Sequence, residues 1–309
     1  MRKILVLRGG ALGDFIVTLP ALALLRARWR AARIELAGNA TAAALARARG
    51  LLDAAHSQHE ARWSALFGRE PLPAMFGAWL SEFDLVINYW PDPDGELHRR
   101  FPLRSGQTFL SATALPADGA PAAVHYCRPL RELGLVTNDY FYSLVSPPSH
   151  GPSETIAIHP GSGATRKNWP MARWRELIGR LDTAVLLILG EAERRAEWNG
   201  LSDTGVPPVG SAWHSGLRFA IELPLEELIA ELSRCRLFLG HDSGIGHLAA
   251  ACGVPSILLF GPTDPVVWAP PAPHVTVLRR AGDLNAITVA EVLAAAISRR
   301  TPARSKSEQ

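Results

Sequence analysis

The sequence predicts an α/β protein made of two doubly wound, Rossmann-like domains with parallel sheets. Three observations predict this fold class. Short apolar runs alternate with longer helical stretches, the alternation occurs twice, and a proline- and glycine-rich segment separates the two sets. The length of 309 residues also suits two domains of roughly 150 residues each.

The apolar runs place the strands and helices in order along the chain. In the first domain, strands are expected at residues 3–7, 33–36 and 84–88, and the alanine-rich stretch 40–49 is expected to be a helix. In the second domain, strands are expected in five apolar runs, which are residues 155–159, 184–189, 236–239, 256–260 and 274–278.

The boundaries follow from composition. Residues 146–152, Ser-Pro-Pro-Ser-His-Gly-Pro, have almost nothing to pack into a core and are the expected linker. We therefore expect domains at residues 1–146 and 153–300, followed by a polar, disordered tail at 301–309. The proline- and charge-rich segment 91–119 is expected to be a surface loop. Because ligands of doubly wound sheets bind at the carboxyl ends of strands, function is expected in an interdomain cleft lined by such loops.

Composition excludes several classes of protein. With 48% hydrophobic, 20% charged and 7% aromatic residues, the chain is neither disordered, collagenous nor a coiled coil. Cys127, Cys235 and Cys252 are too far apart for a CxxC zinc site or a disulfide framework, which favours a reducing compartment. The basic start precedes a short apolar run that is expected to be a strand rather than a signal peptide, and no run approaches the roughly 20 residues that cross a bilayer.

Arginines cluster near residue 30, although the net charge is only +3. Such a cluster can meet anionic lipid or nucleic acid, or it can be the solvated face of a helix. Leu22, Leu25 and Trp29 share one helical face, whereas Arg26, Arg30 and Arg33 fall on another. We therefore interpret the arginines as the outer face of a helix and expect no nucleic-acid partner.

Three glycines and an acid follow the first expected strand, at residues 8–14 (Arg-Gly-Gly-Ala-Leu-Gly-Asp). Glycines permit a tight turn close to a ligand, and Glu35 lies about 20 residues further on, as in a dinucleotide-binding motif. However, the spacing is GGxxG rather than GxGxxG, Asp14 would repel a pyrophosphate, and Pro20 interrupts the helix expected there. A nicotinamide-dependent oxidoreductase therefore fits poorly, and Asp14 could instead be a helix N-cap.

The loop at residues 159–170 follows the first strand of the second domain and reads His-Pro-Gly-Ser-Gly-Ala-Thr-Arg-Lys-Asn-Trp-Pro. Backbone N–H groups, the hydroxyls of Ser162 and Thr165 and the ammonium of Lys167 make it a candidate cradle for a phosphate. Its spacing is not that of a Walker loop. The alternative is a solvated basic turn before a helix that starts near Pro170, with Trp169 used for packing.

The loop that begins at Gly240 follows a later strand and opens a helix. Small residues at a helix N-terminus expose N–H groups and the positive end of the helix dipole to an anion such as a diphosphate. Ser243 and His247 are four residues apart and therefore share a face. Taken singly, Asp242 could be only a cap and His247 only a core-edge histidine. Together with the loop at residues 159–170 that carries Lys167 (the lysine loop), they favour a binding site.

Together the loops resemble the ADP-heptose:lipopolysaccharide heptosyltransferases, the ninth family of glycosyltransferases. The matching stretches are LGDFIVTLPAL at 12–22, HPGSGATRKNWP at 159–170 and LGHDSGIGHLAAACGVPSILLFGPTDP at 239–265. The resemblance implies a GT-B fold with an acceptor-binding N-terminal domain and a nucleotide-sugar-binding C-terminal domain. It implies inverting transfer of heptose, without metal or cofactor, from ADP-L-glycero-β-D-manno-heptose to the inner core of lipopolysaccharide. It places the protein in the cytoplasm, in peripheral contact with the inner membrane.

The resemblance also implies roles for individual residues. Asp14 is similar to the family's general base, with Gly13 and Thr18 beside the acceptor, and Lys167 is similar to its diphosphate-binding lysine. The implied donor site comprises Ser162, Gly163, Thr165, Lys167, Glu191, Asp242, Ser243, Gly244 and His247. Glu191 resembles the acid that holds the nucleoside, although Glu193 lies two residues away and could fill that role.

The chemistry of the loops agrees with these roles. Inverting sugar transfer needs a base for the acceptor hydroxyl and a group that stabilises the departing diphosphate on the opposite face of the sugar. Asp14 provides the first, and Lys167 with the amides of Ser243 and Gly244 provides the second. Three alternatives stay open, namely a glycosyltransferase with another nucleotide sugar or glycan acceptor, the oxidoreductase, and a noncatalytic nucleotide-sugar-binding protein.

Overall fold

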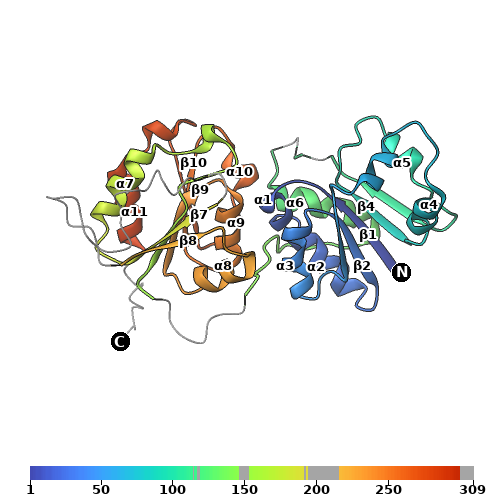
Figure 1. Cartoon of the computed structure of the whole chain (residues 1–309), viewed down its shortest axis with the longest axis horizontal. Coiled ribbons are helices and arrows are strands. Elements are labelled where there is room, and N and C mark those ends of the chain that lie inside the picture. Colours follow the sequence, from blue (N-terminus) through green and yellow to red (C-terminus); the bar gives the residue numbers. More distant parts are fainter. Residues whose placement is uncertain (114, 117–118, 146–152, 191–192, 194–215, 300–309) are drawn as a thin grey trace. The chain divides into compact units, whose positions relative to one another are not determined.

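The computed structural model describes residues 1–113, 115–116, 119–145, 153–190, 193 and 216–299 (Figure 1). The chain forms two compact units, Met1–Leu144 (unit 1) and Val145–Gln309 (unit 2), each with its own parallel sheet. The expected linker at 146–152 and the expected tail at 301–309 lie outside the described residues.

The sheet of unit 1 has five parallel strands in the order β3-β2-β1-β4-β5. They are β1 (Lys3–Arg8), β2 (Arg33–Gly38), β3 (Ala54–Ser57), β4 (Leu85–Asn88) and β5 (Thr108–Ser111). Around them lie α1 (Leu12–Ile16), α2 (Leu19–Arg28), α3 (Ala40–Ala48), α4 (Ala74–Leu80), α5 (Glu96–Arg100) and α6 (Ala122–Cys127), with the 3-10 turns η1 (Ala61–Leu66) and η2 (Arg128–Leu133). The three strands and the helix expected in this half are confirmed as β1, β2, β4 and α3.

The expectation of a surface loop at residues 91–119 is wrong. The described part of this segment contains α5 and the edge strand β5, and Leu97 and Phe101 are buried in the core. The ring of His98 stacks on that of Phe109, with 4.5 Å between their centroids. A few apolar anchors, spaced among prolines and charges, are therefore enough to hold the segment on the sheet.

The arginines near residue 30 are not all on a solvated helix face. Helix α2 ends at Arg28, and Arg33 opens β2. Arg26 is partly buried, because its Nη2 lies 2.6 Å from Asp53 Oδ2 and its Nη1 donates to the carbonyl of Ala32 at 2.8 Å. This arginine therefore ties the end of α2 to the residues that flank β2 and β3.

The sheet of unit 2 has six parallel strands in the order β11-β10-β9-β6-β7-β8. They are β6 (Ile156–Ile158), β7 (Val185–Leu189), β8 (Leu217–Ile221), β9 (Leu237–His241), β10 (Ser256–Phe260) and β11 (Val275–Arg279). The other elements are α7 (Met171–Arg180), α8 (Leu225–Leu232), α9 (Gly244–Ala251), α10 (Pro265–Trp268), α11 (Val289–Ser298), η3 (Thr165–Lys167) and η5 (Leu284–Ala286). All five expected strands are confirmed, and the edge strand β8 is an addition.

Helices cover both faces of this second sheet (Figure 1). Helices α7 and α11 pack together on one face, where Trp174, Leu177 and Val292 join the strand side chains in one apolar cluster. Helices α8 and α9 contact each other on the opposite face. The strands of such a sheet are buried on both sides, which explains why the sequence shows them as continuous apolar runs.

Each sheet changes its direction of winding at one point. In unit 1, β1 pairs with β2 on one side and β4 on the other, and in unit 2, β6 pairs with β7 on one side and β9 on the other. At such a point, successive loops diverge to opposite faces and leave a crevice at the carboxyl ends of the strands, where ligands of α/β proteins bind. The topology therefore points to the loops after β1 and β4 and to those after β6 and β9.

Glu35, which a dinucleotide motif would place on a ribose, is instead buried and paired within unit 1. Its carboxylate lies 2.7 Å from His56 Nε2 and accepts a hydrogen bond from Arg33 Nε at 2.6 Å. Arg62 donates to the other ring nitrogen of His56, so the proton of the neutral imidazole faces Glu35. The hydrogen bond with His56, supported by Arg33, lowers the pKa of Glu35 to about 2.

We predict that Glu35→Gln destabilises unit 1 by roughly 2–3 kcal/mol at pH 7. The pKa in the folded protein lies below the usual value near 4.5. The stabilisation is therefore complete above that value and is lost as the pH falls toward about 2. Urea unfolding between pH 7 and pH 3 measures this loss, with Glu96→Gln, which removes an exposed acid of the same unit, as the control. Equal unfolding free energies for Glu35→Gln and the unmodified protein at pH 7 would contradict the prediction.

Candidate functional site

Asp14 lies just after the central strand of unit 1, at the winding point of the sheet. It is the third residue of α1, and its Oδ2 accepts a hydrogen bond from the backbone N–H of Ala11 at 2.9 Å. Ala11 occupies the N-cap position, so the interpretation of Asp14 as the N-cap is wrong: Asp14 lies three residues later, at N3, and its side chain accepts from the N-cap backbone. The side chain of Asp14 is 31% exposed, which leaves part of the carboxylate open to a ligand.

A buried arginine, which sequence reasoning missed, organises this carboxylate. The guanidinium of Arg8 donates to Thr18 Oγ1 and to the backbone carbonyl of Asp14, both at 3.0 Å, and its Nη2 lies 3.3 Å from Asp14 Oδ1. Its carbon Cζ lies 4.2 Å from the ring centroid of Tyr126. The only sequence signal was a charged residue at the end of an otherwise apolar strand, a position where a cation needs partners.

The two residues expected beside the acceptor differ in exposure. Thr18 is fully buried, and its hydroxyl donates to the carbonyl of Asp14 at 2.9 Å while it accepts from Arg8. Gly13 lies within α1, next to Asp14, and is partly exposed. Gly10 has a φ of 105°, and a Cβ there would fall 2.7 Å from Asp14 Oδ2, so only glycine fits this turn.

In unit 2, the lysine loop (residues 159–170) follows β6 and contains the 3-10 turn η3. Ser162 is buried, and its hydroxyl donates to Asn168 Oδ1 at 2.6 Å, whereas Gly163 and Thr165 are exposed. The ammonium of Lys167 lies 2.7 Å from Asp242 Oδ2, and the side chain of Lys167 keeps 24% of its surface exposed. The loop therefore presents a cation that is held in place on one side and open on the other.

Asp242 joins three loops of unit 2. Its Oδ2 receives Lys167 from the loop after β6 and the hydroxyl of Thr263, at 2.8 Å, from the loop after β10. The interpretation of Asp242 as a helix cap is wrong, because Ser243 is the N-cap of α9 and accepts from the N–H of Gly246 at 3.2 Å. The carboxylate of Asp242 is thereby left to organise the loops.

The remaining donor-loop residues lie at the start of α9. Gly244 is the first residue of this helix, so its N–H belongs to the group that an α-helix leaves without an internal partner. His247 is buried on the next turn, and its N–H donates to the carbonyl of Ser243 at 3.1 Å. Lys167 and the N-terminus of α9 thus provide positive charge at one place, which suits a phosphate or diphosphate.

Of the two acids that could hold a nucleoside, Glu193 alone belongs to the described residues. Glu191 lies outside the described residues, whereas Glu193 is placed just after β7. The carboxylate of Glu193 accepts from the N–H of Gly190 at 2.7 Å, and a Cβ at Gly161 would fall 1.7 Å from its Oε1. Glu193 therefore lies directly against the start of the lysine loop, and Gly161 has no room for a side chain.

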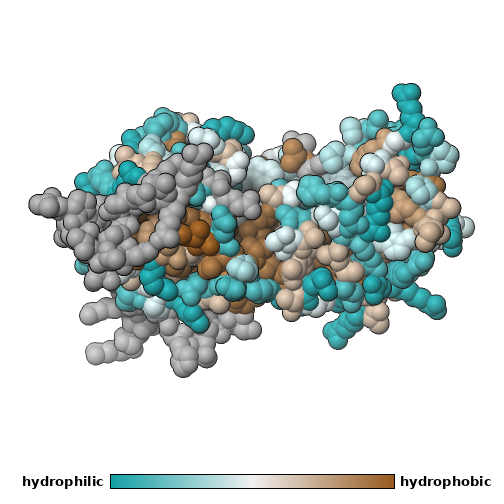
Figure 2. Space-filling view, in the orientation of Figure 1, coloured by the Kyte–Doolittle hydropathy of each residue, from teal (hydrophilic) through white to brown (hydrophobic). Residues whose placement is uncertain are grey.

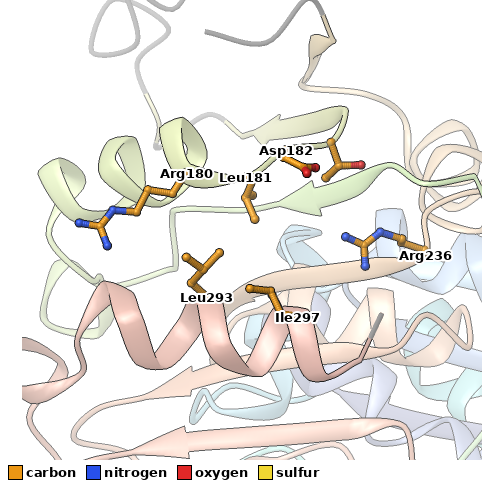
Figure 3. Close-up of a pocket in the computed structure, with 8 residues that line it drawn as sticks. Arg180, Leu181, Asp182, Arg236, Leu293 and Ile297 are labelled. Atoms are coloured by element: carbon orange, nitrogen blue, oxygen red, sulfur yellow. The ribbon is translucent and has the colours of Figure 1, made fainter. Parts of the chain in front are cut away.

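A separate pocket of about 120 Å³ lies at the amino ends of the strands, at the end of the sheet opposite to these loops (Figure 3). Its lining includes Leu181 and Asp182, which precede β7, Arg236, which precedes β9, and Leu293 and Ile297 from α11. Its position at the amino ends of the strands and its small volume separate it from the loops described above.

Among the residues that the structure describes, no three or more His, Cys, Asp or Glu side chains are grouped so that they could hold a metal ion. Within the same ranges, every helix is too short or too polar to cross a membrane.

Comparison with known proteins supports the family that the loop motifs resemble. The profile of glycosyltransferase family 9 (heptosyltransferase) matches residues 134–290, more than half of the chain. Lipopolysaccharide heptosyltransferase 1 of Pseudomonas aeruginosa is 36% identical over 116 residues, which cover 36% of this chain and 29% of that protein. Lipopolysaccharide heptosyltransferase 3 of Escherichia coli is 48% identical over 120 residues, which cover 37% and 33%. The chain thus matches a third or less of the length of these curated relatives.

Solved structures share the fold over nearly the whole chain. A family 9 glycosyl transferase from Veillonella parvula has a TM-score of 0.74 and 20% identity, covering 96% of this chain and 97% of that one. The E. coli heptosyltransferase WaaC, solved with ADP, has a TM-score of 0.71 and 18% identity, covering 96% and 99%. At such identities these structures establish the fold alone, and they confirm the two-domain GT-B class expected from the sequence.

Proposed function

Because this chain belongs to glycosyltransferase family 9, as its motifs predicted, we propose that it transfers a heptose from ADP-L-glycero-β-D-manno-heptose to the inner core of lipopolysaccharide. The observation that carries this proposal is the cluster of Lys167, Asp242 and the α9 N-terminus at the winding point of unit 2. Unit 1 is the acceptor-binding half and unit 2 the donor-binding half of this proposal.

On the donor side, the diphosphate binds to the open side of the Lys167 ammonium and to the N–H groups at the start of α9. These groups meet the charge that grows on the diphosphate as its bond to the sugar breaks, which is where electrostatic stabilisation accelerates the reaction. A diphosphate leaves as an anion and needs no acid to protonate it. The lysine and the helix dipole carry its charge, so we propose that transfer proceeds without a metal and is unchanged by a chelator.

On the acceptor side, Asp14 is the general base. An acceptor hydroxyl gives its proton to Asp14 while its oxygen forms the new bond to the anomeric carbon, and the electron pair of the breaking bond leaves with ADP. Attack opposite the leaving group inverts the anomeric centre. Ala11 N–H and Arg8 hold the carboxylate in one orientation, and Gly13, next to Asp14, has no side chain that would keep a sugar away from it.

A peripheral contact with the cytoplasmic face of the inner membrane is the last part of the proposal. Met75, at the start of α4, is 89% exposed, and Phe67, between η1 and α4, is 53% exposed. Hydrophobic surface is visible in this part of unit 1, at the right of Figure 2. Large apolar side chains that project into solvent suit the interface of a bilayer, where a lipid-linked acceptor resides.

We predict that Lys167→Ala weakens ADP binding by roughly 10- to 150-fold, because a charge-assisted contact to the diphosphate is lost. Transfer should slow as well, since the ammonium also meets the charge of the leaving group. Calorimetric titration with ADP measures the affinity, and Arg166→Ala, which removes the exposed cation next to Lys167, is the matched control. Equal losses for the two variants would show that only general positive charge matters.

We predict that Asp14→Asn lowers turnover by about 10²–10⁴-fold and leaves ADP affinity near that of the unmodified protein. The amide oxygen of asparagine can still accept from Ala11 N–H, but the side chain cannot take up a proton. Single-turnover transfer from ADP-heptose measures the effect, with Asp92→Asn as a control at another carboxylate that accepts backbone N–H groups. Turnover within a few-fold of normal would remove Asp14 from the mechanism.

We predict that replacing both Phe67 and Met75 by serine reduces binding to vesicles of phosphatidylglycerol and phosphatidylethanolamine by at least about tenfold, since two apolar side chains no longer enter the bilayer. Co-sedimentation with the vesicles measures the loss. Val136→Ser is the matched control, because Val136 is 68% exposed in the same unit. The proposal that Phe67 and Met75 contact the membrane is wrong if the control loses as much binding as the double variant, or if the double variant loses none.

A further inference from the structure

His241, the last residue of β9, is completely buried next to the candidate donor site. Its Nε2 lies 2.7 Å from the backbone nitrogen of Trp169, and its Nδ1 lies 3.3 Å from the carbonyl oxygen of Gly161. The histidine thus has both ring nitrogens in use, and both partners are backbone groups of one other segment.

These partners fix the protonation of the ring. Trp169 can only donate through its N–H, so Nε2 must be unprotonated and the proton must reside on Nδ1, which donates to Gly161. Burial lowers the pKa of His241 to about 3, with His159 nearby acting in the same direction, so the ring is neutral at physiological pH. A neutral ring with one donor and one acceptor matches the two backbone groups.

The two backbone groups stand at the two ends of the lysine loop. Gly161 begins the segment that carries Ser162 and Lys167, and Trp169 ends it before α7. A single imidazole from the neighbouring strand therefore closes this loop at its base. The next residue, Asp242, holds the Lys167 ammonium, so β9 contacts the loop at its base and at its functional side chain.

Packing keeps the ring in this orientation. Trp174 of α7 meets the His241 ring edge to face, with 5.3 Å between centroids and 85° between the planes. The indole of Trp169 packs against Trp174 in the same way and donates to the carbonyl of Ile287 at 3.0 Å. A ring flip would place carbon atoms where Nε2 and Nδ1 now lie, and both hydrogen bonds to the backbone would be lost.

We propose that His241 is a positioning residue that locks the lysine loop, from Gly161 to Trp169, in the shape that presents Lys167 to a donor diphosphate. The identity of the ligand rests on the function proposed above, whereas the locking of the loop does not. His241 is buried beneath the loop and acts through Lys167 rather than on the substrate.

The test uses two variants of His241 and one control in the intact protein. His241→Leu keeps an apolar side chain but leaves both backbone groups unpaired. His241→Gln keeps an acceptor and a donor at the end of a flexible chain and serves as the conservative variant. His274→Leu removes a histidine of the same unit that directly precedes β11 and whose Nε2 lies 2.9 Å from the carbonyl oxygen of Ala250 in α9.

Hydrogen–deuterium exchange is the first measurement. For His241→Leu we expect amide exchange across residues 161–169 to rise by at least about tenfold, with the Trp169 amide affected most, because local opening no longer breaks a buried hydrogen bond. His241→Gln should restore part of the protection. Unchanged exchange in this segment, or the same rise for His274→Leu, would overturn the proposal. Should His241→Leu fail to fold, the Gln variant decides the outcome: a smaller but measurable rise in exchange across residues 161–169 supports the proposal, and unchanged exchange there overturns it.

Titration with ADP is the second measurement. His241→Leu should weaken ADP binding by roughly 10- to 100-fold, since two buried backbone groups lose their partners and the loop loses its shape. In the Lys167→Ala background the same substitution should have little further effect, because the loop then has no ammonium to position. Losses that multiply in the double variant would overturn the positioning role. If the unmodified protein binds no ADP, the proposed donor fails, and the exchange experiment still decides whether His241 locks the loop.

Discussion

The carboxylate of Asp242 is the group on which the candidate donor site depends. A buried carboxylate is costly unless a charge and hydrogen-bond donors surround it. Here Lys167 and Thr263 supply those partners from the loops after β6 and β10, while Asp242 itself follows β9. The need to satisfy one buried charge therefore gathers three loops at the winding point of the unit 2 sheet, and it aims the lysine before any ligand is present.

Unit 1 uses a buried charge in a similar way, with the sign reversed. The guanidinium of Arg8 is buried at the end of the central strand and is satisfied by Thr18, by the backbone of Asp14 and by the face of Tyr126. The result is a partly exposed carboxylate held in one orientation. In both units, a charge placed at the carboxyl end of a central strand organises the loop that carries the proposed chemistry.

The central strands and the three loops were predictable from sequence because doubly buried strands form continuous apolar runs and glycine-rich loops follow them. Edge strands β3, β5 and β8 were missed because half-exposed residues dilute that signal. Arg8, Thr263 and His241 were missed for a different reason: their partners lie far away in the chain or on the backbone. The pattern near Asp242 suggested a cap, whereas Ser243 takes that position and frees Asp242 for Lys167. Sequence therefore located the loops of the candidate site, and only the fold showed what holds them together.

The central claim is that the cluster around Lys167 and the α9 N-terminus binds the diphosphate of an adenosine nucleotide. Its most direct test is a calorimetric comparison of ADP, UDP and GDP on the unmodified protein in the presence of a chelator. We expect ADP to bind more tightly than UDP or GDP and the chelator to have no effect. Tighter binding of UDP or GDP, or binding that requires a divalent cation, would contradict it.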